Sequence, residues 1–156
     1  MTTKIILFIT LLAYGIIVSQ SFMYILSLKH VQLNLERNSY TEIRKLIDKS
    51  MRANFKYVIY AALLANLMLV ISTIKTPGRL LFITATIAFV ALIADTLLTV
   101  KRNLPINDII NNWTFDNIPA NWADYRTKWL TTFQYRQIAN ITGFVSLLIG
   151  AVFGTK

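Results

Sequence analysis

Charged and amide side chains stand inside long apolar runs of this sequence, where such groups are uncommon. Asp95 is the only acidic residue within a run, and Thr99 and Arg102 follow it at helical spacing. Arg136 begins another run, with Asn140 one helical turn later. Because charges are costly in membrane-like surroundings, each of them suggests a functional site by default.

Two further amides, Gln20 and Asn66, lie in the remaining apolar runs. With Asp95 and the amide of the last run, they predict a polar cavity in one half of a helix bundle. A structural alternative is that Asp95 pairs with Arg136 or Arg126, while the amides hydrogen-bond between helices. The residue pattern fits both interpretations.

The residue types limit the chemistry that these positions can perform. The chain has no Cys, which excludes disulfides, thiolate nucleophiles and Cys-based metal sites. Its one histidine, His30, stands alone, whereas a metal site needs several His, Cys or carboxylate ligands. A catalytic triad or an axially ligated haem also lacks a suitable His. We therefore expect no metal and no cofactor, and, in an enzyme, proton or oxygen chemistry.

The elements that position these residues follow from the apolar runs. Apolar residues make up 55% of the chain and charged residues 15%, against about 25% charged in an ordinary soluble domain. Each run approaches the roughly 20 residues that cross about 30 Å of hydrocarbon as a helix. We predict an all-α fold, one domain over residues 1–156, with transmembrane helices at about 5–28, 57–74, 80–100 and 137–153. The first run is expected to be a retained helix rather than a cleaved signal peptide, because its apolar character continues to Leu28.

The net charge of +9 would suggest nucleic acid as the partner of a soluble chain. Here the basic residues flank the apolar runs, where they bind anionic lipid, so we expect membrane lipid and no nucleic acid. Of the 16 Lys and Arg, twelve lie in segments 29–56 and 101–136, and four lie on the other side of the predicted membrane: Lys4, Lys75, Arg79 and Lys156. The positive-inside rule then places both long segments in the cytoplasm, with a bacterial inner membrane as the expected location.

Segment 29–56 is predicted to form an amphipathic helix before the second span. Ser39 and Glu42 match a capping box, which predicts a helix start near residue 39. Its two faces have different side chains: Tyr40, Ile43, Ile47, Met51 and Phe55 on one, and Arg44, Lys45, Asp48, Lys49 and Arg52 on the other. A helix in the membrane interface and a helix continuing into the second span both fit. The lack of Pro or Gly before Tyr57 favours continuation.

Segment 101–136 is predicted to form a helical, Trp-rich cap before the fourth span. Pro105 suits the first turn of a short helix, residues 111–120 are rich in turn formers, and Asn121 suits the start of a second helix. All three tryptophans of the chain lie here: Trp113, Trp122 and Trp129. An aromatic belt at the headgroup level and the lining of a ligand pocket are equally consistent with them.

The same segment carries a resemblance to a known family. The run from Asn103 through Pro105 and Ile106 to Asn107, followed by Trp113, Trp122, Arg126, Trp129 and Arg136, resembles the anthrone oxygenase-like family of small four-helix membrane proteins. Gly15 and the run from Ser19 to Phe22 agree more loosely. The chain departs from the family pattern at Phe133, where a polar residue is expected.

The resemblance implies a four-helix fold and the oxidation of anthrones to anthraquinones by O₂ without a metal or flavin. It implies catalytic roles for Arg126 and Arg136, which would bind an oxyanion, and for Asp95 as the membrane-embedded base. The substrate-binding set completes the expected site: Gln20, Asn66, Asn103, Asn107, Trp113, Trp122, Trp129 and Asn140.

Three hypotheses about function follow. The first is a cofactor-free oxygenase that acts on a flat apolar substrate in a cavity capped by 103–136. The second is a non-enzymatic membrane protein that binds a lipid, a quinone or a partner subunit in the same place. A transporter or channel subunit is the least favoured, because the sequence has no visible inverted repeat. An apolar small molecule is the expected ligand, and a homo-oligomer is compatible with the sequence.

Overall fold

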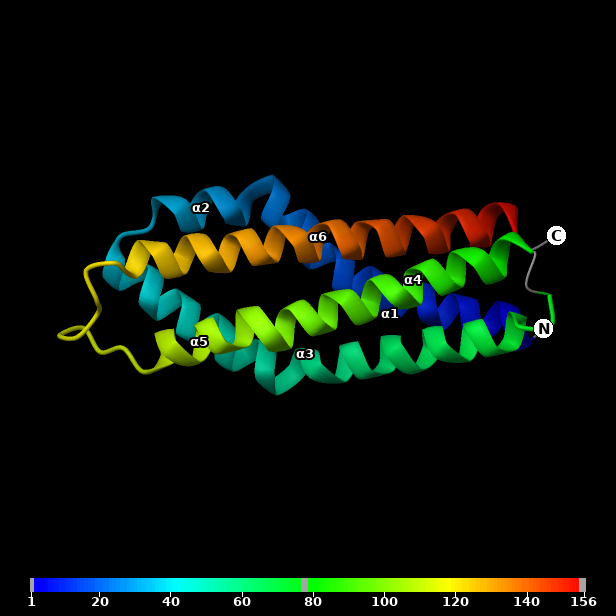
Figure 1. Cartoon of the computed structure of the whole chain (residues 1–156), viewed down its shortest axis with the longest axis horizontal. Helices are drawn as coiled ribbons and strands as arrows, with labels where there is room; N and C mark the ends of the chain where they lie inside the picture. Colours follow the sequence, from blue (N-terminus) through cyan, green and yellow to red (C-terminus); the bar gives the residue numbers. More distant parts are fainter. Residues whose placement is uncertain (1, 77–78, 155–156) are drawn as a thin grey trace.

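The computed structural model describes residues 2–76 and 79–154, and four long helical rods make up most of this part of the chain (Figure 1). In chain order they are α1 (Thr2–Met23) with the π-helix η1 (Tyr24–Leu28) and α2 (Lys29–Asn34); α3 (Arg37–Thr73); α4 (Leu80–Leu98) with the π-helix η2 (Thr99–Asn103) and α5 (Leu104–Asn111); and α6 (Trp122–Phe153). Each rod is long and apolar enough to cross a membrane. The predicted all-α fold, with four helices of membrane-spanning length and composition, is confirmed.

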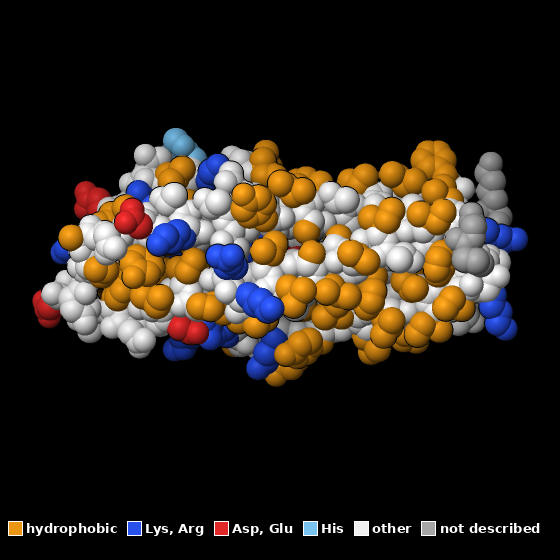
Figure 2. Space-filling view, viewed as in Figure 1, with side chains coloured by type: hydrophobic (Ala, Val, Ile, Leu, Met, Phe, Trp, Pro, Cys, Tyr) orange, Lys and Arg blue, Asp and Glu red, His pale blue; other side chains and the backbone are white. Residues whose placement is uncertain are grey.

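The rods run side by side along the long axis of the molecule, and α1 begins at the same end at which α6 finishes (Figure 1). The 37 residues of α3 span about 55 Å at 1.5 Å per residue, which exceeds the roughly 30 Å of hydrocarbon. Hydrophobic side chains cover the half of the visible face nearer the chain ends, whereas most charged side chains gather on the other half (Figure 2). The half with α2 and α5 therefore extends beyond the hydrocarbon region.

The helices run further than the apolar runs that predicted them. The first rod continues past residue 28 to Asn34, and the third continues past residue 100 to Asn111. Pro105 lies in the first turn of α5, as predicted, but this helix follows η2 without a break. The predicted helix that continues from segment 29–56 into the second span is confirmed for residues 37–56, which belong to α3, whereas residues 29–34 form α2. The predicted capping box is wrong, because α3 begins at Arg37 and its N-cap is Glu36, which makes no side-chain cap.

The face of α3 that turns inward differs from the predicted apolar face. Arg44 and Asp48, which were predicted on the face opposite the apolar one, are buried, whereas Ile43, which was predicted on the apolar face, is 37% exposed. Tyr40 is buried with them. Polar partners on the neighbouring elements account for this orientation, because a buried charge is tolerated where it is paired and hydrogen-bonded. Tertiary pairing, rather than hydropathy, therefore sets the inward face of this part of the helix.

Small residues bring the membrane-spanning helices close together. A Cβ added at Gly143 of α6 would overlap the Tyr14 hydroxyl, and one added at Gly150 would overlap the Thr84 hydroxyl. Tyr14 is fully buried, and its hydroxyl donates to the Ala88 carbonyl at 3.3 Å. Glycine at these contacts allows the close backbone approach that stabilises helix pairs in membranes.

Replacing Gly143 with Ala is expected to lower the free energy of unfolding by about 1–3 kcal/mol, because the added methyl group must displace the buried Tyr14 ring. Gly15→Ala is the matched control, since its Cβ would meet only the Phe144 ring, at 3.9 Å. That variant should match or slightly exceed the wild type, given the higher helix propensity of Ala. Unfolding in detergent followed by circular dichroism at 222 nm compares the two. Equal stabilities for the two variants would contradict the packing described here.

Candidate functional site

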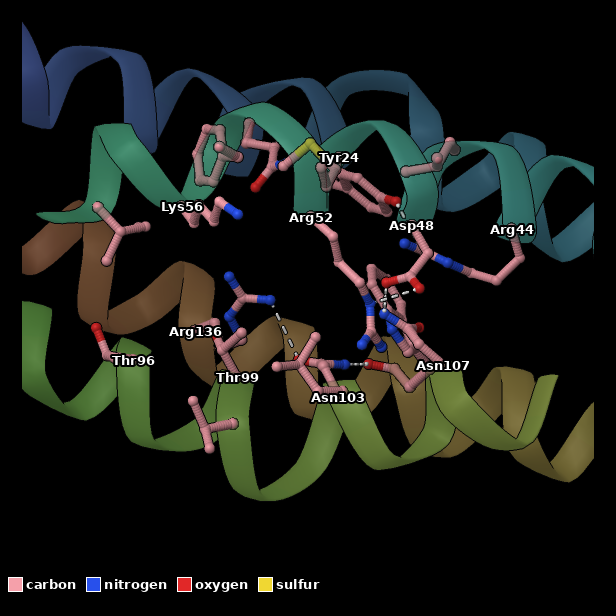
Figure 3. A pocket seen from close by; sticks show the side chains of 18 of the residues that line it. Tyr24, Arg44, Asp48, Arg52, Lys56, Thr96, Thr99, Asn103, Asn107 and Arg136 are labelled. Carbon is pink, nitrogen blue, oxygen red and sulfur yellow. Dashed lines mark hydrogen bonds and ion pairs between the residues drawn. The ribbon is translucent and has the colours of Figure 1, made fainter. Parts of the chain in front are cut away.

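A pocket of about 550 Å³ lies between α3 and the stretch formed by the end of α4, η2 and α5, with α6 and η1 also contributing to its wall (Figure 3). Its apolar wall includes Leu28, Ile47, Met51, Phe55, Ile59, Val100 and Leu104. Its polar wall includes Gln20, Tyr24, Arg44, Asp48, Arg52, Lys56, Thr96, Thr99, Asn103, Asn107 and Arg136. The pocket thus combines an apolar surface with a cluster of charged groups.

One face of α3 supplies most of the charge. Its four charged pocket residues recur at every fourth position, which places them in one row along a helix: Arg44, Asp48, Arg52 and Lys56. In Figure 3, Lys56 from α3 and Arg136 from α6 extend toward the same space from opposite sides. With Arg136 the pocket has four cationic side chains and one acidic side chain. Arg52 and Arg136 are ion-paired, whereas Arg44 and Lys56 form no ion pair with the described residues, so the wall is electropositive.

Asp48 accepts hydrogen bonds from three side chains at the wall of the pocket. It is only 2% exposed. Its Oδ1 accepts from Asn107 Nδ2 at 2.6 Å, and its Oδ2 accepts from Asn111 Nδ2 at 2.7 Å and from Arg52 Nε at 2.8 Å. Arg52 also bonds Asp108 on α5, at 2.7 Å. These bonds join α3 to α5 and leave both oxygens of the carboxylate occupied.

Arg44 is buried at the pocket and forms no ion pair with a carboxylate of the described residues. It is 4% exposed, and its guanidinium carbon lies 4.1 Å from the centre of the Trp129 ring. One nitrogen reaches the Tyr24 hydroxyl at 3.5 Å, whereas its Nε has no hydrogen-bond partner among the described residues. Trp129 in turn stacks on Phe133, with ring centres 5.1 Å apart. A buried guanidinium with spare donor capacity favours an anionic oxygen as its missing partner.

Arg136 connects the pocket to the interior of the bundle. Its Nε donates to Asp95 Oδ1 at 2.7 Å, and its Nη1 lies 3.3 Å from Asn103 Oδ1. Asp95 is fully buried and does not line the pocket. Of the two alternatives for Asp95, the structure therefore gives the ion pair with Arg136. This pairing places the carboxylate behind Arg136, away from the space where a catalytic base would have to act.

The structure brings together five of the predicted site residues, on three of the four rods. The pocket is lined by Gln20, Asn103, Asn107, Trp129 and Arg136. The remaining six lie elsewhere: Asn66, Asp95, Trp113, Trp122, Arg126 and Asn140. Of the four residues predicted to line one cavity jointly, Gln20, Asn66, Asp95 and Asn140, only Gln20 lines this pocket.

Two of the predicted cavity amides are buried in helix packing. Asn66 is fully buried against α4, in the amide orientation that pairs it with the Ala85 carbonyl at 3.1 Å and the Phe89 N–H at 3.2 Å. Asn140 is 2% exposed on α6. The spacing of polar residues along a single helix does not specify the neighbour that each side chain faces.

Three further predicted site residues, Arg126, Trp113 and Trp122, make contacts at the end of the bundle, outside the pocket. Arg126 Nη1 donates to the carbonyls of Gln32 and Leu35, each at 3.1 Å, and its guanidinium lies 4.6 Å from the Trp122 ring centre. Trp113 packs edge-on against Tyr125, with ring centres 5.4 Å apart. The Trp113 contact joins the 112–121 connection to α6, and the Arg126 bonds join α6 to α2 and to the turn that follows it.

Sequence reasoning missed several pocket residues on η1 and α3: Tyr24, Arg44, Asp48, Met51, Arg52 and Lys56. The available signal was the four-residue spacing of the charged positions, which places them in a single row along the helix. Arg44, Asp48 and Arg52 were predicted on the charged face of an amphipathic helix, and such a face usually turns toward water. The burial of Asp48 depends on the amides of α5, whose position relative to α3 only the tertiary structure provides.

No group of three or more His, Cys, Asp or Glu side chains within residues 2–76 and 79–154 is arranged to hold a metal ion. Comparisons of the chain with protein-family models, with curated proteins and with solved structures found no match. The resemblance to the anthrone oxygenase-like family therefore stays a prediction, and the geometry of the pocket carries the functional argument.

Proposed function

We propose that this protein binds a flat, largely apolar molecule with an oxyanion, such as a carboxylate, phenolate or enolate, in the pocket between α3 and η2. The observation that carries the proposal is the electropositive cluster set within an apolar wall. Lys56 and Arg136 extend into the same space and are suited to bind the oxyanion (Figure 3). Electrostatic pairing in such a partly apolar site is stronger than in water.

The position of the pocket favours a ligand that enters from the bilayer. Tyr60 and Val100, which line it, are 63% and 55% exposed, and both lie next to the ends of the apolar runs. A molecule moving within the membrane would reach the pocket at this edge with its rings in the hydrocarbon region. Its polar group would then face Lys56 near the boundary, where charged side chains reach the interface.

Binding of anthracene-9-carboxylate, a flat three-ring carboxylate, tests this proposal through quenching of tryptophan fluorescence. Lys56→Gln should weaken binding about tenfold, the effect of losing one charge-assisted bond. Lys49→Gln is the matched control, because Lys49 is exposed on the same helix and outside the pocket. Neutral anthracene should bind more weakly than the carboxylate. Equal affinities for the Lys56 and Lys49 variants would contradict the proposal.

A second candidate function is cofactor-free oxidation of such a ligand by O₂, in keeping with the family resemblance. An anthrone that loses a proton from its central CH₂ carbon becomes an enolate, and O₂ adds to this carbon to form a hydroperoxide. Loss of water from the hydroperoxide leaves the second carbonyl of an anthraquinone. The cationic groups favour this candidate because they would stabilise the enolate. Oxygen uptake with anthrone tests it: a rate no higher than the spontaneous oxidation would exclude this substrate, without affecting the binding proposal.

The proposal includes an orientation in which 29–56 and 101–136 lie in the cytoplasm of a bacterial cell, supported by the excess of Lys and Arg in these segments. The chain has no Cys, so a cysteine introduced at Asp116 would be unique. A membrane-impermeant thiol reagent should label it in inverted vesicles and not in intact spheroplasts. The reverse pattern would place these segments outside.

A further inference from the structure

A second groove lies between η2–α5 and α6 and shares no lining residue with the first pocket. Its volume is about 660 Å³, and its wall contains two cations, Arg102 and Lys128, with the tyrosines Tyr125 and Tyr135. We propose that this groove binds the phosphate of an anionic phospholipid, whose acyl chains follow the apolar surface below it. Nothing in the proposed function of the first pocket depends on this second site.

The two cations of the groove are available for an anion. Arg102 is exposed and forms neither an ion pair nor a hydrogen bond with the described residues. Lys128 is also exposed, and its ammonium lies 5.8 Å from the centre of the Tyr125 ring. Asp124, one turn before Lys128, makes no ion pair with it. A phosphate bridging the two side chains would satisfy both, since guanidinium and phosphate form short, charge-assisted hydrogen bonds.

The groove lies at the depth of lipid headgroups. Leu98, at its membrane end, belongs to the third apolar run, and Arg102 follows about 6 Å further along the helix. The headgroup layer of one leaflet is about 5–7 Å thick, half the difference between the total and the hydrocarbon thickness of a bilayer. Tyr135 is 60% exposed beside this level, a position that interfacial tyrosines prefer. The cations therefore meet the layer in which phosphates are concentrated.

The walls of the groove are fixed in place before a lipid arrives. Asn103 Nδ2 donates to the Trp129 carbonyl at 3.1 Å, and Arg136 bonds Asp95 at 2.7 Å, so both bonds join the third rod to α6. Thr131 and Thr132 add hydroxyl groups on the α6 side. A preformed groove binds a headgroup with less loss of side-chain entropy than a mobile surface would. This distinguishes it from isolated lysines elsewhere on the surface.

Native mass spectrometry of the full chain, titrated with phosphatidylglycerol in detergent, tests the site. The double variant Arg102→Gln/Lys128→Gln should weaken the tightest phosphatidylglycerol adduct about 30-fold, from about fivefold per cation. Lys29→Gln/Lys101→Gln is the matched control: it removes two cations from the same side of the membrane, and neither residue lines the groove. This control should bind as the wild type does.

Two further titrations identify the source of the phosphate. Phosphatidylcholine, which is zwitterionic, should bind the wild type more weakly than phosphatidylglycerol and should respond little to the double variant. Inorganic phosphate at millimolar concentration should not displace the lipid. Equal lipid binding by the double variant and the control, no preference for the anionic lipid, or displacement by free phosphate would each overturn the proposal. Circular dichroism checks folding, which substitutions at two exposed side chains should leave unchanged.

Discussion

Replacing Asp95 with Asn is expected to lower the free energy of unfolding by about 3–5 kcal/mol, because the guanidinium of Arg136 would stay in the bundle without its counter-charge. Asp95 is fully buried and holds Arg136 at 2.7 Å. The double variant Asp95→Asn/Arg136→Gln removes both charges and should recover a large part of the loss. Unfolding in detergent, followed by circular dichroism, measures all three proteins.

Asp108→Asn is the control for the Asp95 experiment. Asp108 also pairs with an arginine at 2.7 Å, but its side chain is 60% exposed. Exposed ion pairs contribute only about 0–1 kcal/mol, so this variant should unfold close to the wild type. An Asp95→Asn protein within 1 kcal/mol of the wild type would contradict a structural ion pair. If such a stable variant had also lost activity, Asp95 would regain the role of a catalytic base.

Replacing Asp48 with Ala should have the second largest effect, a loss of about 3 kcal/mol in the free energy of unfolding. The carboxylate accepts hydrogen bonds from Asn107, Asn111 and Arg52, and bonds to a charged acceptor contribute about 1.5–3 kcal/mol each. The contribution of Arg52 is discounted because its side chain is 41% exposed. Chemical unfolding compares this variant with Asp124→Asn, an exposed acid on α6 that forms no ion pair with the described residues.

The isosteric variant Asp48→Asn separates stability from ligand binding. It keeps the shape of the side chain and removes the one acidic group of the pocket wall. Affinity for anthracene-9-carboxylate should therefore rise in the folded fraction, although stability falls. A lower affinity in a folded Asp48→Asn protein would show that Asp48, rather than the surrounding cations, contacts the ligand.

The sequence was sufficient to predict the four membrane-spanning helices and the continuity of α3, because both follow from local properties of the chain. Apolar runs of the right length define the rods, and no Pro or Gly interrupts the stretch that leads to Tyr57. The ends of the rods were harder to predict. The first and third helices continue as polar helix past residues 28 and 100, where hydropathy falls but the backbone hydrogen bonding does not stop.

The site was predicted only in part, since its composition depends on which helix faces which. Asn103, Asn107 and Arg136 were predicted as site residues because segment 101–136 has a distinctive pattern of Pro, Trp and Arg, and all three line the pocket. Arg44 and Asp48 were placed on the charged face of an amphipathic helix, and the amides that bond Asp48 lie about sixty residues away in the chain, on α5. Pairings of that kind are set by tertiary contact, which the periodicity of a single helix cannot specify.

The most direct test of the binding pocket is anomalous diffraction from crystals soaked with 10-bromoanthracene-9-carboxylate. The bromine marks one end of a flat ring system and the carboxylate the other. The binding proposal predicts a bromine peak within the apolar wall near Phe55 and Ile59, with the carboxylate density directed at Lys56 and Arg136. A bromine peak in the groove beside Arg102, or a fully occupied site elsewhere with this pocket empty, would contradict it.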